Sequence, residues 1–405
     1  MVASAHLATS LGLGDVLTFD MGGTTAKAGA VIGGRPDVVT EFEAAGKTHS
    51  GRSIKGSGYP IRGEFIDLAE VSAGGGTIAR LDDAGELQVG PDSAGSVPGP
   101  ACYGKGGSMP TVTDANVVLG RLNPKELLGG KMPIREDLAR ASLQGVSAGS
   151  SARVEETAVA IIKLVNDSMA RAISIVSVER GRDPRDFTLL AFGGAGPSHA
   201  CDLAEELGVR RIFVPVHAGL FSAYGLLAGE LTREFSFPIM KVGTDLRTSF
   251  TSLEESASRA MRAEGFRRFS VERYLEARYA GQSHELLLPY RGDSNVRPSF
   301  DARHKSLYGY SSDDPLEVVN IRVKAKVARP PLKPPSQEQG PPLKPRSRMA
   351  WVGGARRRTR VYRREGTPIG SRGRGPCIVE ELDSTIVVNP SWEWRAGAHG
   401  MVLSR

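Results

Sequence analysis

Two glycine-rich segments hold the residue types that bind phosphate groups. The first reads Asp-Met-Gly-Gly-Thr-Thr from Asp20 and lies between two apolar stretches typical of β-strands. The Asp20 carboxylate could hold a magnesium ion or its waters. Gly22 and Gly23 leave room for backbone N–H groups to approach phosphate oxygens, and Thr24 and Thr25 add hydroxyl donors. A hairpin turn with incidental glycines is the alternative interpretation.

The second segment, GGAGPSHA, contains Gly193, Gly194 and Gly196, follows a strand-like stretch and begins a helix. Its N–H groups and the helix N-terminus favour an anion or the ribose and base of a nucleotide. A tight strand-to-helix turn would also need such glycines. His199 in the same loop could act as an acid or base, or could be a structural residue.

Other polar residues have weaker patterns. Asp114 and Asn116, in TVTDAN, could be metal or substrate ligands, but Thr113 or Asp114 could simply cap a helix. Cys102 lies in a glycine-rich loop and could be a nucleophile or a structural thiol. Two residues in a predicted β segment have an open role: Gln282 and His284.

The elements that would position the two segments form an α/β pattern. Apolar stretches predict strands at 15–20, 26–32 and 37–42, a long helix at 155–180, and then a βαβ unit from a strand at 187–192, a helix through 203–207 and a strand at 211–215. Such alternation implies a parallel or mixed sheet covered by helices. We therefore expect one α/β domain over 1–235, with a glycine-rich insertion at 44–110 that is not core scaffold but forms ordered turns.

The remaining residues change in character. A helix near 252–264 and strands at 271–279, 284–290 and 316–328 predict a mixed to mostly β module over 236–329. Residues 330–346 are rich in proline and read as an extended linker, and 347–405 as a small β segment.

Composition excludes several classes of protein. The 405 residues, 40% of them hydrophobic, suit two or three globular domains, and no leader-like start or long apolar run indicates secretion or a membrane span. Three distant cysteines fit a reducing cytoplasm. The net charge of +7 is concentrated in C-terminal arginines without interleaved aromatics, so we expect a solvated face and no nucleic-acid partner.

A DxGGT hairpin followed about 170 residues later by a strand–GGxGP–helix junction resembles the second lobe of the actin-like, ribonuclease H-like ATPase fold of sugar kinases and heat-shock ATPases. More specifically, the chain resembles the hydantoinase A family, which includes N-methylhydantoinases, 5-oxoprolinases and acetone carboxylase β subunits. The matching strings cover nearly the whole chain: DMGGTTAKAG (20–29), AGGGTIARLD (73–82), VGPDSAGSVPGPACYG (89–104), PTVTDANVVLGRL (110–122), MARAISIVSVERGRDPRDF (169–187), FGGAGPSHA (192–200), YAGQSHEL (279–286) and IVEELDSTIVV (378–388).

The resemblance implies an ATP- and Mg²⁺-dependent, oligomeric subunit that phosphorylates the carbonyl oxygen of a cyclic amide or ketone. A hydantoinase B-type partner would complete hydrolysis or carboxylation. Asp20 would be the catalytic magnesium ligand, the Gly22–Thr25 turn would contact phosphates, and the second glycine loop would lie against the nucleoside. The family also carries a first lobe with its own phosphate hairpin, which we expect from a separate polypeptide or a longer gene product.

Two positions depart from the family pattern, because Lys27 stands where many members have an acidic residue and Glu70 where they have histidine. These departures could change the substrate or the activity. Two other interpretations stay open: a non-catalytic scaffold without the first lobe, and a sugar-kinase-like ATPase. The strings outside the two loops argue against the kinase.

Overall fold

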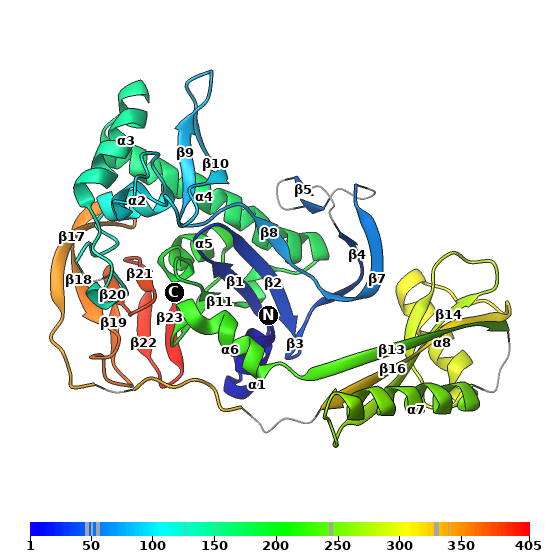
Figure 1. The fold of residues 1–405 in the computed structure, drawn as a ribbon. Coiled ribbons are helices and arrows are strands. Elements are labelled where there is room, and N and C mark those ends of the chain that lie inside the picture. The colour runs from blue at the N-terminus through cyan, green and yellow to red at the C-terminus, as the bar shows by residue number, and fades with distance from the viewer. Residues whose placement is uncertain are drawn as a thin grey trace. The chain divides into compact units, whose positions relative to one another are not determined.

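The computed structural model describes residues 1–44, 48–49, 52–53, 57–125, 127–150, 152–242, 246–327, 332–338 and 340–405. They form two compact units, one of residues 1–228 with 333–405 and one of 229–332 (Figure 1). The second unit begins seven residues before the predicted module at 236–329, since 236 − 229 = 7. The last 73 residues, 333–405, share a unit with the N-terminal domain, whereas we expected a separate linker and β segment.

A mixed sheet forms the centre of the first unit. Its strand order is β19-β22-β23-β12-β11-β1-β2-β3, with β8 pairing β2. β11 runs parallel to both β1 and β12, and the other pairs are antiparallel. The bounds are β1 Val16–Met21, β2 Ala26–Ile32, β3 Arg35–Pro36, β8 Ala69–Val71, β11 Thr188–Phe192, β12 Arg211–Pro215, β19 Arg372–Arg374, β22 Glu393–Ala396 and β23 Gly400–Ser404.

The predicted βαβ unit is confirmed. β11 is followed by α5, Ala200–Leu207, and then by β12, which pairs with β11 in parallel. All five residues of β11 are buried, as expected for a strand in the middle of a covered sheet. Gly208, in the left-handed region at φ +74°, ends α5 because a residue without Cβ adopts that conformation without strain.

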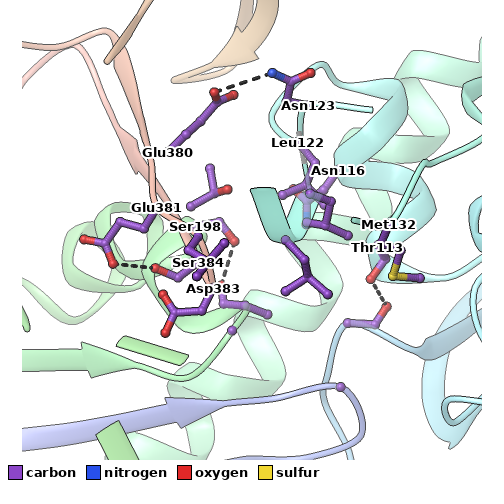
Figure 2. Close-up of a pocket in the computed structure, with 18 of the residues that line it drawn as sticks. Thr113, Asn116, Leu122, Asn123, Met132, Ser198, Glu380, Glu381, Asp383 and Ser384 are labelled. Atoms are coloured by element: carbon purple, nitrogen blue, oxygen red, sulfur yellow. Dashed lines mark hydrogen bonds between the residues drawn. The ribbon is translucent and has the colours of Figure 1, made fainter. Parts of the chain in front are cut away.

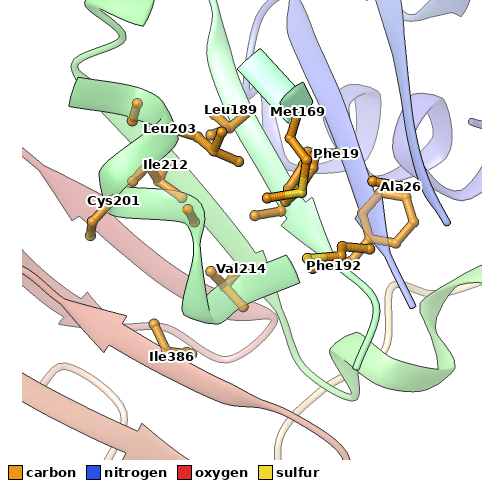
Figure 3. Close-up of a cluster of buried hydrophobic side chains, with 14 of the residues drawn as sticks. Phe19, Ala26, Met169, Leu189, Phe192, Cys201, Leu203, Ile212, Val214 and Ile386 are labelled. Atoms are coloured by element: carbon orange, nitrogen blue, oxygen red, sulfur yellow. The ribbon is translucent and has the colours of Figure 1, made fainter. Parts of the chain in front are cut away.

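The helix predicted at 155–180 is α4, Val154–Val176. Its apolar face is buried, and Figure 3 shows Met169 of α4 beside Phe19 of β1 and Leu189 of β11, with Leu203 of α5 close by. The other helices of this unit are α1 Val2–Leu11, α2 Val112–Val118, α3 Glu136–Ser150 and α6 Phe221–Ala228. Short 3₁₀ turns lie at Ala101–Tyr103, Leu127–Gly130, Val178–Arg180, Pro184–Asp186, Gly196–Ser198 and Ala218–Leu220. Among the described residues no helix combines the length and apolarity that a membrane crossing requires.

The described part of the insertion at 44–110 contains short strands: β5 Thr48–His49, β6 Arg52–Ser53, β7 Tyr59–Ile66, β8, β9 Thr77–Leu81 and β10 Leu87–Ser93. β4, Val38–Ala44, precedes them and enters the insertion only at Ala44. β4 pairs with β7 and β9 with β10, while β8 extends the central sheet. Residues 45–47, 50–51 and 54–56 lie outside the described residues. The insertion thus contributes to the core through β8, which we did not expect.

The C-terminal strands divide between two sheets. β17 Arg346–Val352, β18 Ala355–Arg363, β20 Cys377–Glu380 and β21 Thr385–Val388 form a four-stranded sheet, whereas β19, β22 and β23 join the central one. β23 pairs along the whole of β12, and buried Trp392 precedes β22. Residues 347–405 are therefore an integral part of the first unit, because their strands complete its sheet.

The second unit is a four-stranded antiparallel sheet, β13-β16-β14-β15, with two helices. Its elements are β13 Leu231–Val242, α7 Arg247–Ala263, β14 Ser270–Tyr279, β15 Leu286–Pro289, a 3₁₀ turn at Asp293–Asn295, α8 Val296–Tyr308 and β16 Leu316–Val327. Phe250 of α7, Phe300 of α8 and Ile321 of β16 are fully buried in its core. We did not predict α8, whose apolar pattern is weak. Gln282 and His284 lie between β14 and β15, not within a strand.

Candidate functional site

The turn between β1 and β2 is the predicted phosphate-binding segment. It closes through a hydrogen bond of 3.1 Å from Gly22 N–H to the Thr25 carbonyl oxygen. Gly23 and Thr24 are exposed at its tip. A Cβ built at Gly22 or Gly23 would meet no atom within 4 Å. The fold itself therefore does not require glycine at these two positions for space.

Asp20 is the penultimate residue of β1, beside this turn. Its Oδ2 accepts a hydrogen bond of 2.8 Å from Ser222 Oγ, at the start of α6. A Cβ at Gly193 would lie 2.6 Å from Asp20 Oδ1 and 2.3 Å from the Met21 carbonyl oxygen, and Gly193 has a positive φ of +85°. Gly193 is thus needed so that the end of β11 can pack against Asp20.

The rest of the second glycine loop also packs on β1. Ala195 N–H donates to the Met21 carbonyl oxygen at 3.0 Å, and a Cβ at Gly196 would lie 3.4 Å from Met21 N. Gly196 begins the 3₁₀ turn that leads into α5. The two segments, far apart in sequence, therefore meet through the parallel pairing of β1 with β11.

A third glycine run, Gly74–Gly76, packs directly on the turn. Gly75 N–H donates to the Gly22 carbonyl oxygen at 3.0 Å, and Gly76 N–H donates to that of Gly23 at 2.6 Å. A Cβ at Gly74 would lie 2.5 Å from Thr24 N. The sequence marked AGGGT as an ordered turn but gave no sign that it buttresses the Gly22–Gly23 tip.

The turn between β20 and β21 is the fourth segment that packs at this place, beside the three glycine-rich segments. Glu381 N–H donates to the Ser384 carbonyl oxygen at 3.0 Å, and Ser384 Oγ donates to Glu381 Oε2 at 3.1 Å. A Cβ at Gly194 would lie 3.5 Å from the Asp383 carbonyl oxygen, so this turn lies against the second glycine loop. Asp383 Oδ2 is buried and has no hydrogen-bond partner among the described residues.

These loops enclose a cavity of about 290 Å³. In Figure 2, Glu381, Asp383 and Ser384 lie on one side, facing Thr113, Asn116 and Leu122 on the other. The lining residues are Gly22, Gly23, Gly75, Tyr103, Thr113, Asn116, Leu122, Asn123, Leu127, Leu128, Met132, Gly194, Ala195, Ser198 and 380–385. Of the predicted site residues, Gly22, Gly23 and Gly194 line the cavity. The other predicted residues of these two loops do not line the cavity but are close in sequence to residues that do: Asp20, Thr24, Thr25, Gly193 and Gly196.

The sequence left two roles open for Asp114, metal or substrate ligand and helix cap, and the structure shows a capping role, with Thr111 as the N-cap in place of Thr113 or Asp114. It is fully buried, and its Oδ2 accepts hydrogen bonds from Thr111 N–H at 2.9 Å and Thr111 Oγ1 at 2.7 Å. The backbone N–H groups of Ala101 and Cys102 also donate to its carboxylate, at 3.2 and 2.8 Å. Thr111 is the N-cap of α2, and Asp114 completes a capping box three residues later. Four donors already occupy this carboxylate.

His199 and Cys102 are also structural. The His199 ring is fully buried, with Nδ1 at 2.7 Å from Asn166 Oδ1 and Nε2 at 3.5 Å from Asn116 Nδ2. Burial, with a smaller effect of the Arg121 charge, lowers the pKa of His199 to about 4, so the ring is neutral at pH 7. Burial also raises the pKa of the Cys102 thiol far above its usual value, which argues against a nucleophile.

The two departures from the family pattern are neighbours in space. In the sheet register Lys27 of β2 lies opposite Asp20 of β1 and opposite Glu70 of β8. Lys27 Nζ lies 3.7 Å from Glu70 Oε1, and both side chains are about half exposed, at 46% and 53%. The two residues therefore form one ion pair beside Asp20, and their effects are not independent.

The sheet, its helices and the glycine loops at one end of β1 and β11 define an ATPase-like α/β fold. The nucleotide-free structure of an acetone carboxylase has this fold, with a TM-score of 0.86 and 21% identity over 100% of this chain and 60% of that chain. The chain belongs to the hydantoinase/oxoprolinase family, whose model matches residues 1–235.

Two relatives are more similar in sequence. An uncharacterized protein of Methanocaldococcus jannaschii is 42% identical over 96% of this chain and 58% of its own length. The caprolactamase subunit alpha of Pseudomonas jessenii is 36% identical, again over 96% and 58%. The crystal structure of the ATP-dependent caprolactamase from that organism has a TM-score of 0.72, at 34% identity over 100% of this chain and 60% of that one. This chain thus spans less than two thirds of the length of these relatives.

Proposed function

We propose that this chain is the nucleotide-binding part of an ATP-dependent enzyme that phosphorylates the carbonyl oxygen of a small cyclic amide or ketone. The observation that carries the proposal is that Gly22, Gly23 and Gly194, from loops about 170 residues apart in sequence, line one cavity. Two similar proteins are named as an ATP-dependent caprolactamase and an ATP-dependent acetone carboxylase. A lactam and a ketone share a carbonyl group, and this is the group we propose as the phosphoryl acceptor.

Phosphorylation suits such substrates because an amide carbonyl is a poor electrophile, whereas its O-phosphorylated form has a good leaving group. The protein's part in phosphoryl transfer is mainly to position the reactants and to stabilise charge. Gly22 N–H is already used within the turn, so the backbone N–H groups of Gly23 and Thr24 at the exposed tip would contact the phosphates. The Thr24 and Thr25 hydroxyls would add donors, and Gly194 would lie against the nucleoside.

Asp20 is the residue that would hold magnesium, directly or through water. Mg²⁺ commonly uses one or two carboxylates with substrate phosphates and keeps several waters, so a single carboxylate beside a phosphate turn fits it. When bound there, the ion would neutralise charge on the transferred phosphoryl group. Ser222, which donates to Asp20 Oδ2, and Gly193, which packs on Oδ1, would fix the orientation of the carboxylate.

The proposal includes a second subunit. One similar protein is named as an alpha subunit. We propose a hydantoinase B-type partner that completes hydrolysis or carboxylation of the activated carbonyl.

Isothermal titration calorimetry with Mg·ATP tests the proposal. Wild type is compared with Asp20→Asn and with a control variant, Asp186→Asn. The control makes the same charge change on an exposed residue just before β11, at the end of that strand that is away from the glycine loop. We expect binding by wild type and Asp186→Asn and loss of binding in Asp20→Asn. The titrations are repeated on the longest natural form of the protein, because the relatives extend beyond the matched region. Absence of binding in every form would contradict the proposal and favour a non-catalytic scaffold.

A further inference from the structure

A second cavity, of about 550 Å³, shares the β20–β21 turn with the first. Both cavities are lined by Glu380, Glu381, Leu382 and Asp383, so the turn is a common wall. The other lining residues of the second cavity are Lys125, Gly129, Gly130, Val216, His217, Gln337, Glu338, Arg363, Arg364 and Glu365. None of the residues predicted to bind phosphate or nucleoside is among them.

Arg364 is the unusual residue of this second cavity. It is only 4% exposed, and its Nη1 lies 3.1 Å from Glu381 Oε1 in an ion pair. Its Nε donates to Gln337 Oε1 at 3.0 Å, and its carbonyl oxygen accepts from Gln337 Nε2 at 2.7 Å. Among the described residues neither Nη1 nor Nη2 has a hydrogen-bond partner of good geometry. A buried guanidinium whose Nη donors lack well-aligned partners is costly, yet Gln337 holds Arg364 in this position. A ligand that completes its hydrogen bonds would remove this cost.

We infer that the second cavity binds a small carboxylate, which pairs with Arg364 in place of the Glu381 side chain. The planar guanidinium matches a carboxylate with two parallel hydrogen bonds. Glu381 is a weak competitor, because its Oε1 also has no well-formed hydrogen bond and burial raises its pKa. Lys125 and His217 add positive charge or donors to the wall.

The charges around the cavity limit the ligand to a small one with a single anionic group. Glu338, Glu365 and Asp383 also line it and would repel a polyanion such as a nucleotide. They would instead attract an amine. Ring opening of a cyclic amide gives an amino acid with one carboxylate and one amine, which matches a cavity with one buried arginine and several acidic residues. The identification of the ligand as a ring-opened amino acid rests on the proposed function, whereas the inference of a carboxylate site does not.

The shared turn would connect the two cavities. Ser384 lines the first cavity and donates to Glu381 Oε2. A carboxylate that displaces Glu381 from Arg364 would therefore change the position of a hydrogen-bond partner of Ser384. We expect a ligand in the second cavity to change the affinity for Mg·ATP. By thermodynamic linkage, Mg·ATP would change the affinity for that ligand by the same factor.

The test is ligand-observed NMR on the full chain without nucleotide, so that it is independent of ATP binding. The probes are hexanoate, 6-aminohexanoate and hexylamine, and the proteins are wild type, Arg364→Lys and Arg364→Gln. We expect wild type to bind both carboxylates more tightly than hexylamine, with carboxylate binding weakened about tenfold or more in Arg364→Gln and less in Arg364→Lys. Tighter binding of 6-aminohexanoate than of hexanoate identifies a ring-opened amino acid, and equal binding identifies a simple carboxylate. Equal binding of hexylamine, or unchanged binding in Arg364→Gln, would overturn the inference.

A second measurement covers the case in which Arg364→Gln does not fold. Glu338 is exposed and lines the second cavity but not the first. In a Glu338→Trp variant that keeps Arg364, we expect hexanoate to change the tryptophan fluorescence in a saturable way and at lower concentration than hexylamine. A signal that does not respond to hexanoate would refute a carboxylate site in this cavity.

Discussion

Replacing Gly23 by alanine separates ligand binding from folding. A Cβ at Gly23 meets no atom within 4 Å, and the residue lies exposed at the tip of the β1–β2 turn. Gly74 is the contrasting position, because a Cβ there would lie 2.5 Å from Thr24 N and 2.6 Å from the Gly23 carbonyl carbon and oxygen. Gly145, on α3, is a matched control, since a Cβ there also meets nothing within 4 Å.

The expected magnitudes follow from these contacts. Gly23→Ala should change the free energy of unfolding by no more than about 0.5 kcal/mol, as for other exposed substitutions. Its methyl group would stand where a phosphate approaches, and loss of one charge-assisted hydrogen bond, about 1.5–3 kcal/mol, would weaken Mg·ATP binding by about 10- to 150-fold. Gly74→Ala forces backbone atoms apart, so we expect about 1–3 kcal/mol of destabilisation together with weaker binding. Gly145→Ala should be neutral or stabilising by up to ~1 kcal/mol and should bind normally.

Chemical denaturation and calorimetric titration with Mg·ATP are run on the three variants and wild type. The decisive comparison is Gly23→Ala with Gly145→Ala, since both should retain wild-type stability or better. Wild-type affinity in Gly23→Ala would refute a phosphate site at this turn. Loss of stability in Gly23→Ala would show that the glycine is needed for folding, and the binding argument would then fail for a different reason.

Three further predictions concern the buried polar groups. Burial lowers the pKa of His199 from 6.5 to about 4, so the stability contributed by the neutral ring is complete above pH 6.5 and is lost as the pH falls through 4, by ~3 kcal/mol. The unfolding free energy of His199→Gln should therefore depend less steeply on pH between 4 and 6.5. A slope equal to that of wild type would contradict a buried neutral His199. Trp392 Nε1 donates to Glu205 Oε1 at 2.8 Å, so Glu205→Ala should leave a buried donor unpaired and lower the free energy of unfolding by about 1–3 kcal/mol. Glu206→Ala on the same helix should lower it much less. Equal losses in the two variants would argue against a stabilising role of the Trp392–Glu205 hydrogen bond. Burial raises the pKa of all three thiols, those of Cys102, Cys201 and Cys377. A thiol reagent should therefore modify none of them in the native protein and all three after unfolding. Rapid labelling of the native protein would be inconsistent with their burial.

Local pattern was sufficient to predict four strands of the central sheet: β1, β2, β11 and β12. The strand at 26–32 and the strand at 211–215 agree with β2 and β12 to the residue, because mostly apolar stretches end at turn-forming residues there. The helix predicted at 155–180 ends four residues earlier, at Val176, where the chain changes to a 3₁₀ turn before Gly181. Helix ends are decided by local hydrogen bonds that the periodicity of apolar residues does not report.

Non-local pairing is what the sequence did not reveal. β23 pairs with β12 although some 190 residues separate them, and β8 joins β2 from within a segment that reads as loop. The β20–β21 turn reaches the first cavity for the same reason: its residues, ELDS, read as an ordinary hairpin connection until the sheets place them against Gly194 and Gly219. Acids in a turn are usually solvated, and only tertiary contacts distinguish the buried Asp383 oxygen from that case.

The glycines of the two motifs and of the Gly74–Gly76 run differ in whether packing requires them, and this difference bears on the functional interpretation. Gly193 and Gly74 are required by packing, because a Cβ at either would overlap backbone atoms of the neighbouring loop. Gly22 and Gly23 face open space, so packing does not explain them. A fold under no functional demand would gain from a residue other than glycine at two unhindered positions, since glycine costs backbone entropy. The close approach of a ligand to this turn, as we propose, would supply the missing reason, and Gly23→Ala tests it directly.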